Sequence, residues 1–323
     1  MPMPVMKNRT SSILALTAAV ITLAFSSGPR VAAQTGGVIA EVRVRVAQRD
    51  FAGGERVIAD HHRAYGVTSQ SLEAMSWMGR GALALQRWAA AERYARDTYD
   101  LSVAQLKGRP LDADPYLPIA LGAAIEVLGQ VQVARDARSE AVAFLEREAN
   151  TYRNTSIATR IQKNLNLVSL VGTTAPALDL SEYLGPRPAS LAALKGKVIV
   201  MFFWAHWCAD CKIQGPVLDR LLAKYAARGL IIVAPTQRYG YVAAGRDAAA
   251  ADERLYIEQI RRVHYPALAS AAVPLASSNH RRYGVSTTPT LVVVDRAGVV
   301  RLYHPGRMTD LELEPLTRDL INR

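Results

Sequence analysis

The sequence predicts an all-helical N-terminal part followed by an α/β domain. From Val38 to Leu170, apolar residues recur mostly at helical spacing. Breaks rich in Gly and Pro at 172–176 and 185–188 then interrupt this pattern. Beyond them, short apolar runs alternate with helical segments, which is the order typical of an α/β domain.

One segment of the helical part is ambiguous. Val38, Val42 and Val46 lie at helical spacing, whereas Val42, Val44 and Val46 alternate with arginines as in a strand. We expect a helix, because the segments that follow are helical. Further helices are expected at Ser71–Gln86, Trp88–Leu106, Ile119–Leu128, Arg138–Glu148 and Thr159–Leu170.

Two stretches of the helical part are similar to each other. Asp50–Arg56 and Arg87–Arg93 share an aromatic-Ala start and a Glu-Arg pair, at a separation close to a helical-hairpin repeat. Met78-Gly79 and Leu121-Gly122 resemble the Leu-Gly pair of tetratricopeptide helices. An irregular helical bundle fits the pattern equally well. In both cases the surface of the helical part is expected to bind a peptide or a partner protein. The alternative is that this part is a structural or dimerising cap.

The α/β part is expected to begin with a buried strand at Val198–Trp204 and a second at Leu230–Ala234. A third at Leu291–Val294 turns back into Val299–Tyr303 as a hairpin. Helices are expected at Lys212–Arg228, Asp252–Val263, Asn279–Tyr283 and Thr309–Asn322.

Residues 1–33 have the features of an export signal. Lys7 and Arg9 precede the apolar core Ile13–Phe25, and small residues follow at Val31–Ala33. The core is shorter than the ~20 residues that span a bilayer, so cleavage is expected, with an uncleaved membrane anchor as the alternative. Since no cysteine directly follows the core, lipoprotein processing is excluded. A periplasmic or otherwise extracytoplasmic location is predicted.

The charge of the chain is positive but dispersed. The net charge is +11, and 36 basic against 28 acidic residues remain once the three of the export signal are removed. Because these residues form no run, we expect no nucleic-acid partner. Weak attraction to an anionic membrane surface or to an acidic partner is compatible with this charge.

The two cysteines of the chain, Cys208 and Cys211, lie within Trp204–Cys211, between a predicted strand and a predicted helix. A disulfide across so short a loop restricts the unfolded chain very little, so redox chemistry is predicted rather than a structural bridge. A metal site with His206 would lack a fourth ligand nearby. No cofactor is expected besides the Cys208–Cys211 disulfide.

Cys208 is expected to be the nucleophile, because unpaired N–H groups and the helix dipole favour its thiolate. It would form a mixed disulfide with the substrate, which Cys211 would resolve in an effectively unimolecular step. The carboxylate of Asp210 disfavours that thiolate and should make the pair more reducing. His206 is expected to be a surface residue.

Residues Gly196–Cys211, with Pro216, Tyr283–Val285 and Thr288-Pro289, resemble the exported TlpA/ResA-type thiol-disulfide oxidoreductases of the thioredoxin superfamily. The resemblance covers about residues 172–323 and implies a thioredoxin-like fold with a cis-proline at Pro289. It further implies that Thr288 offers its backbone to an extended substrate segment, with Trp207 and Pro289 as neighbouring substrate contacts.

The same resemblance implies a reductase that receives electrons from a membrane thiol donor. Its expected partners are disulfide-containing extracytoplasmic proteins such as apocytochrome c. The predicted organisation is therefore a signal peptide at 1–33, a helical domain at 34–170 and a thioredoxin-like domain at 171–323.

The chain departs from thioredoxin at one chemical position. Thioredoxin has a buried acid six residues before its first cysteine, and this chain has Phe202 there. The lysine partner of that acid is also missing, with Pro235 near its place. The proton acceptor for Cys211 is then water, Glu253 or Glu258, and the sequence does not choose among them.

Two other functions compete with disulfide reduction. A thiol peroxidase of the redoxin type would need Thr or Ser three residues before its reactive cysteine, where this chain has Ala205. A partner-binding helical scaffold would use the redox domain only secondarily. Replacing Cys208 with Ser separates them, because a scaffold would survive the change and a reductase would not.

Overall fold

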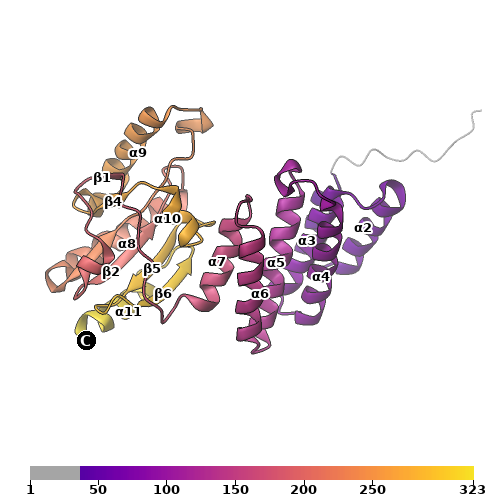
Figure 1. Ribbon diagram of the computed structural model, residues 1–323, viewed down its shortest axis with the longest axis horizontal. Helices are drawn as coiled ribbons and strands as arrows, with labels where there is room; N and C mark the ends of the chain where they lie inside the picture. The colour runs from indigo at the N-terminus through magenta and orange to yellow at the C-terminus, as the bar shows by residue number, and fades with distance from the viewer. Residues whose placement is uncertain (1–36) are drawn as a thin grey trace, which may run out of the picture. The chain divides into compact units, whose positions relative to one another are not determined.

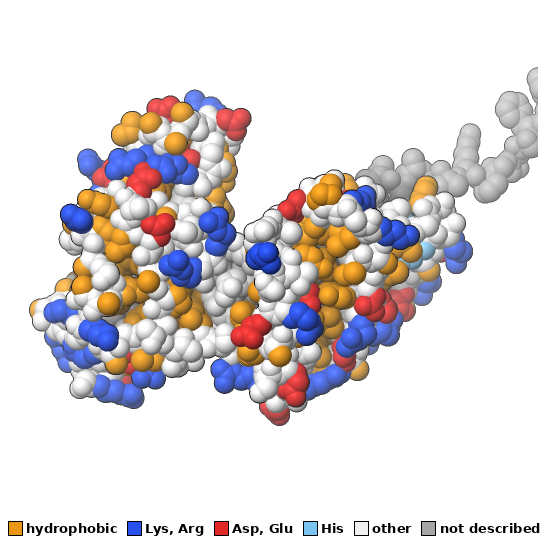
Figure 2. Space-filling model, viewed as in Figure 1, with side chains coloured by type: hydrophobic (Ala, Val, Ile, Leu, Met, Phe, Trp, Pro, Cys, Tyr) orange, Lys and Arg blue, Asp and Glu red, His pale blue; other side chains and the backbone are white. Residues whose placement is uncertain are grey.

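This computed structural model describes residues 37–323 (Figure 1). The predicted export signal lies outside the described residues. On the visible face of the described residues, Lys and Arg side chains are dispersed among acidic and hydrophobic ones (Figure 2). The N-terminal part of these residues consists of seven α-helices. The helices are α1 Val38–Ala47, α2 Phe51–Tyr65, α3 Ser69–Ala84, α4 Trp88–Leu106, α5 Leu117–Ala134, α6 Arg138–Thr151 and α7 Ala158–Ser169. The ambiguous first segment is helical, as expected, and only α2 was not predicted from apolar spacing.

The helices form two sets of neighbours. Helices α1, α3, α5 and α7 contact one another in that order, and α2, α4 and α6 pack against them. A residue with positive φ stands in each of the turns α1–α2, α3–α4 and α5–α6, namely Arg49, Gln86 and Asp136. The two similar stretches of sequence start α2 and α4 directly after this turn, so their likeness accompanies a shared turn geometry.

Helix α5 lies in the core of this part, with residues such as Leu117, Leu121 and Ile125 fully buried. It is the one helix among the described residues that is long and apolar enough to span a membrane, and 61% of it is buried inside the protein. Its central position between α3, α4, α6 and α7 accounts for this apolar composition.

The C-terminal part is built on a four-stranded sheet in the order β3-β2-β5-β6. Strand β2 pairs in parallel with β3 and antiparallel with β5, which in turn pairs antiparallel with β6. The strands are β2 Val198–Phe203, β3 Leu230–Val233, β5 Thr290–Val294 and β6 Val300–Pro305. The helices are α8 Ala209–Tyr225, α9 Ala250–His264, α10 Ser277–Arg282 and α11 Asp310–Asn322. All four predicted strands and all four predicted helices of this part are confirmed.

Smaller elements complete the domain. A two-stranded antiparallel sheet joins β1 Tyr183–Leu184 to β4 Val273–Pro274. At two residues each, these strands are too short to produce an alternating pattern, which is why the sequence did not predict them. Short 3₁₀ helices of this domain lie at Leu191–Leu194, Ala226–Arg228, Ala243–Gly245 and Pro266–Ala269, and a further one, Leu111–Ala113, precedes α5 in the helical part.

Both faces of the sheet are covered. Every residue of β2 and β5 is buried, because one apolar cluster forms on each face. Leu170, which follows α7, belongs to one of these clusters, and α7 also contacts α10 and β6. A central, fully enclosed β2 gives the segment that follows it a rigid starting point.

Candidate active site

Cys208 and Cys211 form a disulfide at the start of α8. Cys208 is the N-cap residue of this helix, and the backbone N–H of Cys211 donates to its Sγ at 3.0 Å. Their Cα atoms are 5.2 Å apart, and Cys208 is 3% exposed while Cys211 is fully buried. In the reduced protein the same N–H and the helix dipole would stabilise an anionic Cys208 sulfur.

Trp204 fixes the beginning of the cysteine motif. Its indole N–H donates to the carbonyl of Ala234 at 3.0 Å, and its backbone N–H donates to the carbonyl of Pro235 at 3.2 Å. The hydroxyl of Thr236 donates back to the carbonyl of Trp204 at 2.7 Å. These bonds tie the end of β2 to the end of β3, so the cysteines begin from a fixed point.

Pro289 lies beside this motif because of strand pairing. Phe203, the last residue of β2, pairs with Thr290, the first residue of β5. The residues next to this pair, Trp204 and Pro289, therefore meet at the same end of the sheet. The Thr288–Pro289 peptide bond is cis, which confirms the prediction. Thr288 itself is half-buried.

The prediction that His206 is a surface residue is wrong. Its side chain is 1% exposed, and its Nε2 lies 3.3 Å from Oε1 of Glu253 in α9. The rings of Tyr239, Tyr241 and Tyr256 surround it at centroid distances of 5.6, 5.4 and 5.4 Å. Burial lowers the pKa of His206, while the Glu253 carboxylate opposes this shift.

Glu253 organises the loop that covers the histidine. Its carboxylate accepts the backbone N–H of Tyr239 at 2.5 Å and that of Gly240 at 2.9 Å. The ring of Tyr239 in turn packs edge to face on Trp207, with centroids 5.5 Å apart. Through these contacts, Glu253 supports the exposed Trp207 next to Cys208.

The two acids proposed as proton acceptors have different surroundings. Glu258 is held by Arg261 and Arg262, and the Arg261 guanidinium lowers the pKa of the Glu258 carboxyl to about 2. Glu253 is 1% exposed and contacts His206, two residues before the first cysteine. Of these two acids, only Glu253 therefore belongs to the surroundings of the cysteine motif.

The remaining predicted residues are placed as follows. Trp207 is 49% exposed, and the side chain of Asp210 is 61% exposed, with its Oδ1 4.0 Å from Nε of Arg307. Phe202, which occupies the position of the thioredoxin acid, is fully buried. Ala205 is also fully buried and carries no hydroxyl that could hold a peroxide.

Gln214 is a site residue that sequence reasoning missed. It lies one turn beyond Cys211 in α8, is 1% exposed, and its Oε1 accepts the backbone N–H of Met308 at 2.8 Å. This bond fixes the segment before α11, which also carries Arg307. A polar residue on the buried side of α8 was the available signal.

Comparison with known proteins agrees with this geometry. Residues 170–320 match the Redoxin family. The match spans the whole four-stranded sheet and its helices as far as residue 320. The strand order of this sheet and the cis-proline beside a Cys-x-x-Cys helix start make the fold thioredoxin-like.

Several bacterial proteins are similar to this domain. Thioredoxin-like protein YneN of Bacillus subtilis is 29% identical over 146 residues, covering 44% of this chain and 76% of YneN. The thiol-disulfide oxidoreductase ResA of Geobacillus thermodenitrificans is 25% identical over 147 residues, covering 45% and 74%. The thiol:disulfide interchange protein DsbE of Pseudomonas aeruginosa is 30% identical over 134 residues, covering 41% and 65%.

A similar solved structure is that of a putative thiol:disulfide interchange protein DsbE from Chlorobium tepidum. It is 27% identical, covers 46% of this chain and 95% of its own, and has a TM-score of 0.35.

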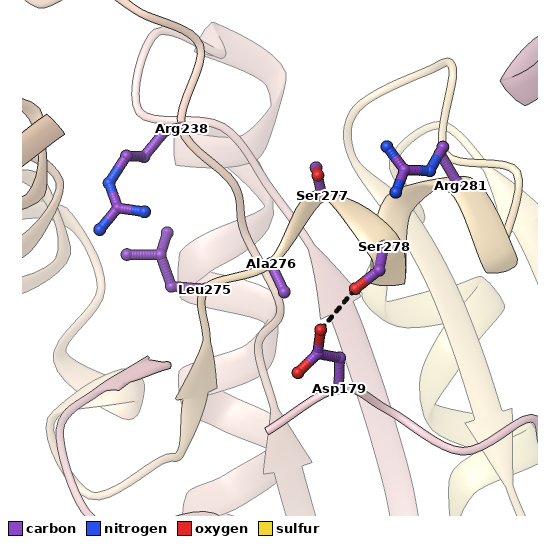
Figure 3. A pocket seen from close by; sticks show the side chains of 7 residues that line it. All are labelled: Asp179, Arg238, Leu275, Ala276, Ser277, Ser278 and Arg281. Atoms are coloured by element: carbon purple, nitrogen blue, oxygen red, sulfur yellow. Dashed lines mark hydrogen bonds between the residues drawn. The ribbon is translucent and has the colours of Figure 1, made fainter. Parts of the chain in front are cut away.

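The C-terminal part also has a surface hollow of about 400 Å³ (Figure 3). It is lined by Asp179, Arg238, Leu275, Ala276, Ser277, Ser278 and Arg281. Asp179 accepts the hydroxyl of Ser278 at 2.8 Å, and Arg238 pairs with Glu182. Because none of the cysteine-motif or cis-proline residues lines it, this hollow is not the redox site.

Proposed function

We propose that this protein is an extracytoplasmic thiol-disulfide oxidoreductase that reduces protein disulfides through Cys208 and Cys211. The observation that carries the proposal is the position of Cys208 at the start of α8, hydrogen-bonded by the N–H of Cys211 and adjacent to the cis-Pro289 end of β5. The names of the relatives, which include thiol-disulfide oxidoreductases, support the same reaction class.

The first step uses the reduced dithiol. The Cys208 thiolate attacks one sulfur of the substrate disulfide, the substrate S–S bond breaks, and the departing substrate thiolate takes up a proton. The product is a mixed disulfide between Cys208 and the substrate. The exposed Trp207 and the backbone of Thr288 would border the substrate segment at this stage.

The second step releases the substrate. Cys211 loses its proton and attacks Sγ of Cys208, which forms the Cys208–Cys211 disulfide and expels the second substrate thiolate. Two electrons have then passed from the protein to the substrate. A membrane thiol donor would restore the dithiol by the reverse exchange. Among buried groups near the motif, the His206–Glu253 pair is the candidate to receive the Cys211 proton, with water as the alternative.

The location and partners of the reaction belong to the same proposal. The sequence of residues 1–33 supports export, which would place the protein in the periplasm or another extracytoplasmic space. Disulfide-containing proteins there, such as apocytochrome c, would be the substrates. The shared turns at Arg49, Gln86 and Asp136 support a helical-hairpin repeat in the described part of the helical domain. A protein partner of that domain is part of the proposal.

A trapping experiment tests this function. The Cys211→Ser variant cannot resolve mixed disulfides, so it should accumulate them through Cys208 when it is expressed in its own compartment. Mass spectrometry of the trapped adducts would identify both substrates and electron donor. The Cys208→Ser, Cys211→Ser double variant is the matched control. Absence of adducts, with a normal free thiol at Cys208, would contradict a disulfide reductase.

A further inference from the structure

One face of the helical part combines positive charge with exposed apolar side chains. On α3, Trp77 and Arg80 lie on the same side, which is opposite to buried residues such as Met75 and Ala82. Glu126 occupies the corresponding side of α5, and Arg160 and Lys163 that of α7. We call this set, together with Arg43 of α1, the cationic face.

Contacts among these residues show that they form one cluster. The guanidinium carbons of Arg43 and Arg80 lie 4.5 and 3.6 Å from the ring centroid of Trp77. Glu126 accepts from Arg160 at 2.7 Å and from Lys163 at 3.0 Å. The side chains therefore connect helices α1 and α3 on one side and α5 and α7 on the other.

The charges of this cluster do not balance. Glu73 lies on the same side of α3, four residues before Trp77 and seven before Arg80. Four cations therefore stand against two carboxylates, those of Glu73 and Glu126, and burial raises the pKa of Glu73. Within residues 37–323, Arg80 has no carboxylate within ion-pair distance, and its guanidinium donates to the carbonyl and hydroxyl of Ser76. Burial and the nearby Arg160 lower the pKa of Arg80 to about 10.

Glu126 and Glu73 act on Arg80 electrostatically, but neither forms a direct ion pair with its guanidinium in residues 37–323. A partly buried cation that lacks a direct ion pair is costly, and an added anion would offset this cost. Arg80 is already oriented by its stacking on Trp77, so little of its side-chain freedom would be lost when an anion binds.

Exposed apolar side chains lie on the same sides of α5 and α7. Ile119 and Val133 each stand seven residues from Glu126, which places them on its side of α5, and they are 40% and 36% exposed. Leu167 stands seven residues after Arg160 on α7 and is 43% exposed. A ligand that fits this face would carry both carboxylates and apolar side chains.

Charge also excludes two occupants from the chain itself. Residues 1–36 contain Lys7, Arg9 and Arg30 and no acidic residue, so they would be repelled. A second copy carries the same net charge of +11, so like charges would also repel it.

We propose that the cationic face docks an acidic segment of a partner protein that also bears apolar side chains. This docking goes beyond the redox chemistry and does not depend on Cys208 or Cys211.

Binding of a defined peptide tests the proposal. The probe is a fluorescein-labelled dodecapeptide of alternating Glu and Leu, titrated with the full chain and followed by fluorescence anisotropy. The Arg80→Glu variant should weaken binding by about tenfold or more, the loss expected from one charge-assisted contact. Arg153→Glu, an equal change of net charge on the exposed turn after α6, should alter affinity by less than about twofold.

Three outcomes would overturn the docking proposal: no saturable binding, equal losses in both variants, or equal affinity for a Lys-Leu peptide. If Arg80→Glu fails to fold by circular dichroism, Arg80→Gln takes its place, and a loss there that exceeds the loss in Arg153→Gln supports the proposal. Reduction of a small disulfide by these variants should stay unchanged, so that a failure of docking remains distinct from a failure of the redox function.

Discussion

Replacing Glu253 with Gln should loosen the loop of Tyr239 and Gly240, which packs over His206 and Trp207. The carboxylate faces three nitrogen atoms, the backbone nitrogens of Tyr239 and Gly240 and Nε2 of His206. Gln has the same shape, but its amide group cannot accept a hydrogen bond at its nitrogen end. One of the N–H groups would therefore lose its hydrogen bond to a charged acceptor.

The magnitude follows from this count. Loss of one hydrogen bond to a charged group costs about 1.5–3 kcal/mol. At roughly 2–4 °C of melting temperature per kcal/mol for a domain of this size, a loss of about 2 kcal/mol lowers the melting temperature by roughly 4–8 °C. The Tyr239 ring would also lose its fixed position on Trp207, so tryptophan fluorescence should change, and the KM for a protein disulfide should rise more than kcat falls.

The assay compares thermal unfolding and insulin reduction in wild type, Glu253→Gln and Asp252→Asn. Asp252 is the neighbouring carboxylate of α9 and is exposed in the first turn of the helix, so its loss should cost no more than about 1 kcal/mol. Equal melting temperatures and equal KM values for the two variants would refute a positioning role for Glu253.

Three further predictions concern pH, potential and substrate contact. Burial lowers the pKa of His280 from 6.5 to about 4. The unfolded chain then binds the proton first, so the free energy of unfolding should fall by roughly 3 kcal/mol between pH 7 and pH 4 on account of this group. Chemical denaturation of His280→Gln should show a smaller fall, and an unchanged pH profile would contradict this. Asp210→His should make the reduction potential less negative in a glutathione titration, and a more negative potential would count against the predicted effect of Asp210. Trp207→Ala should raise KM for a protein disulfide while leaving reduction of a small aromatic disulfide within about twofold, and equal losses on both would show that Trp207 acts on the cysteines instead.

The parts of the fold that the sequence predicted are those with strong local patterns. β2 is a continuous apolar run, and so is β5 after Thr290. Gly229, with a positive φ of 97°, follows the helical segment that begins at Ala209. The cis bond at Pro289 was predicted from the family resemblance. β1 and β4 were missed because strands of two residues carry no periodic signal.

The burial of His206 could not be predicted from its neighbours. It depends on Tyr239, Tyr241 and Glu253, which lie more than 30 residues away along the chain. The two tyrosines belong to a loop with no regular pattern, and Glu253 lies in α9. A signal for Glu253 did exist. Glu253, Ile257 and Ile260 lie at i, i+4 and i+7 on the buried side of α9, a spacing that Glu258 does not share.

The pairing of Phe203 with Thr290 places the reacting groups of this domain independently of the loop between β3 and α9. The positions of Cys208 and Pro289 are set by adjacent strands, whereas the loop between β3 and α9 belongs to neither strand. Ile257 and Ile260 of α9 pack in the same apolar cluster as both cysteines, so this helix is part of the domain core. Residues 237–249 of the loop can therefore change in length or sequence without altering the strand pairing that places the cis-proline beside the cysteine motif. Access to the redox site is in this sense a replaceable module, and substrate choice can be altered there while the exchange reaction stays the same.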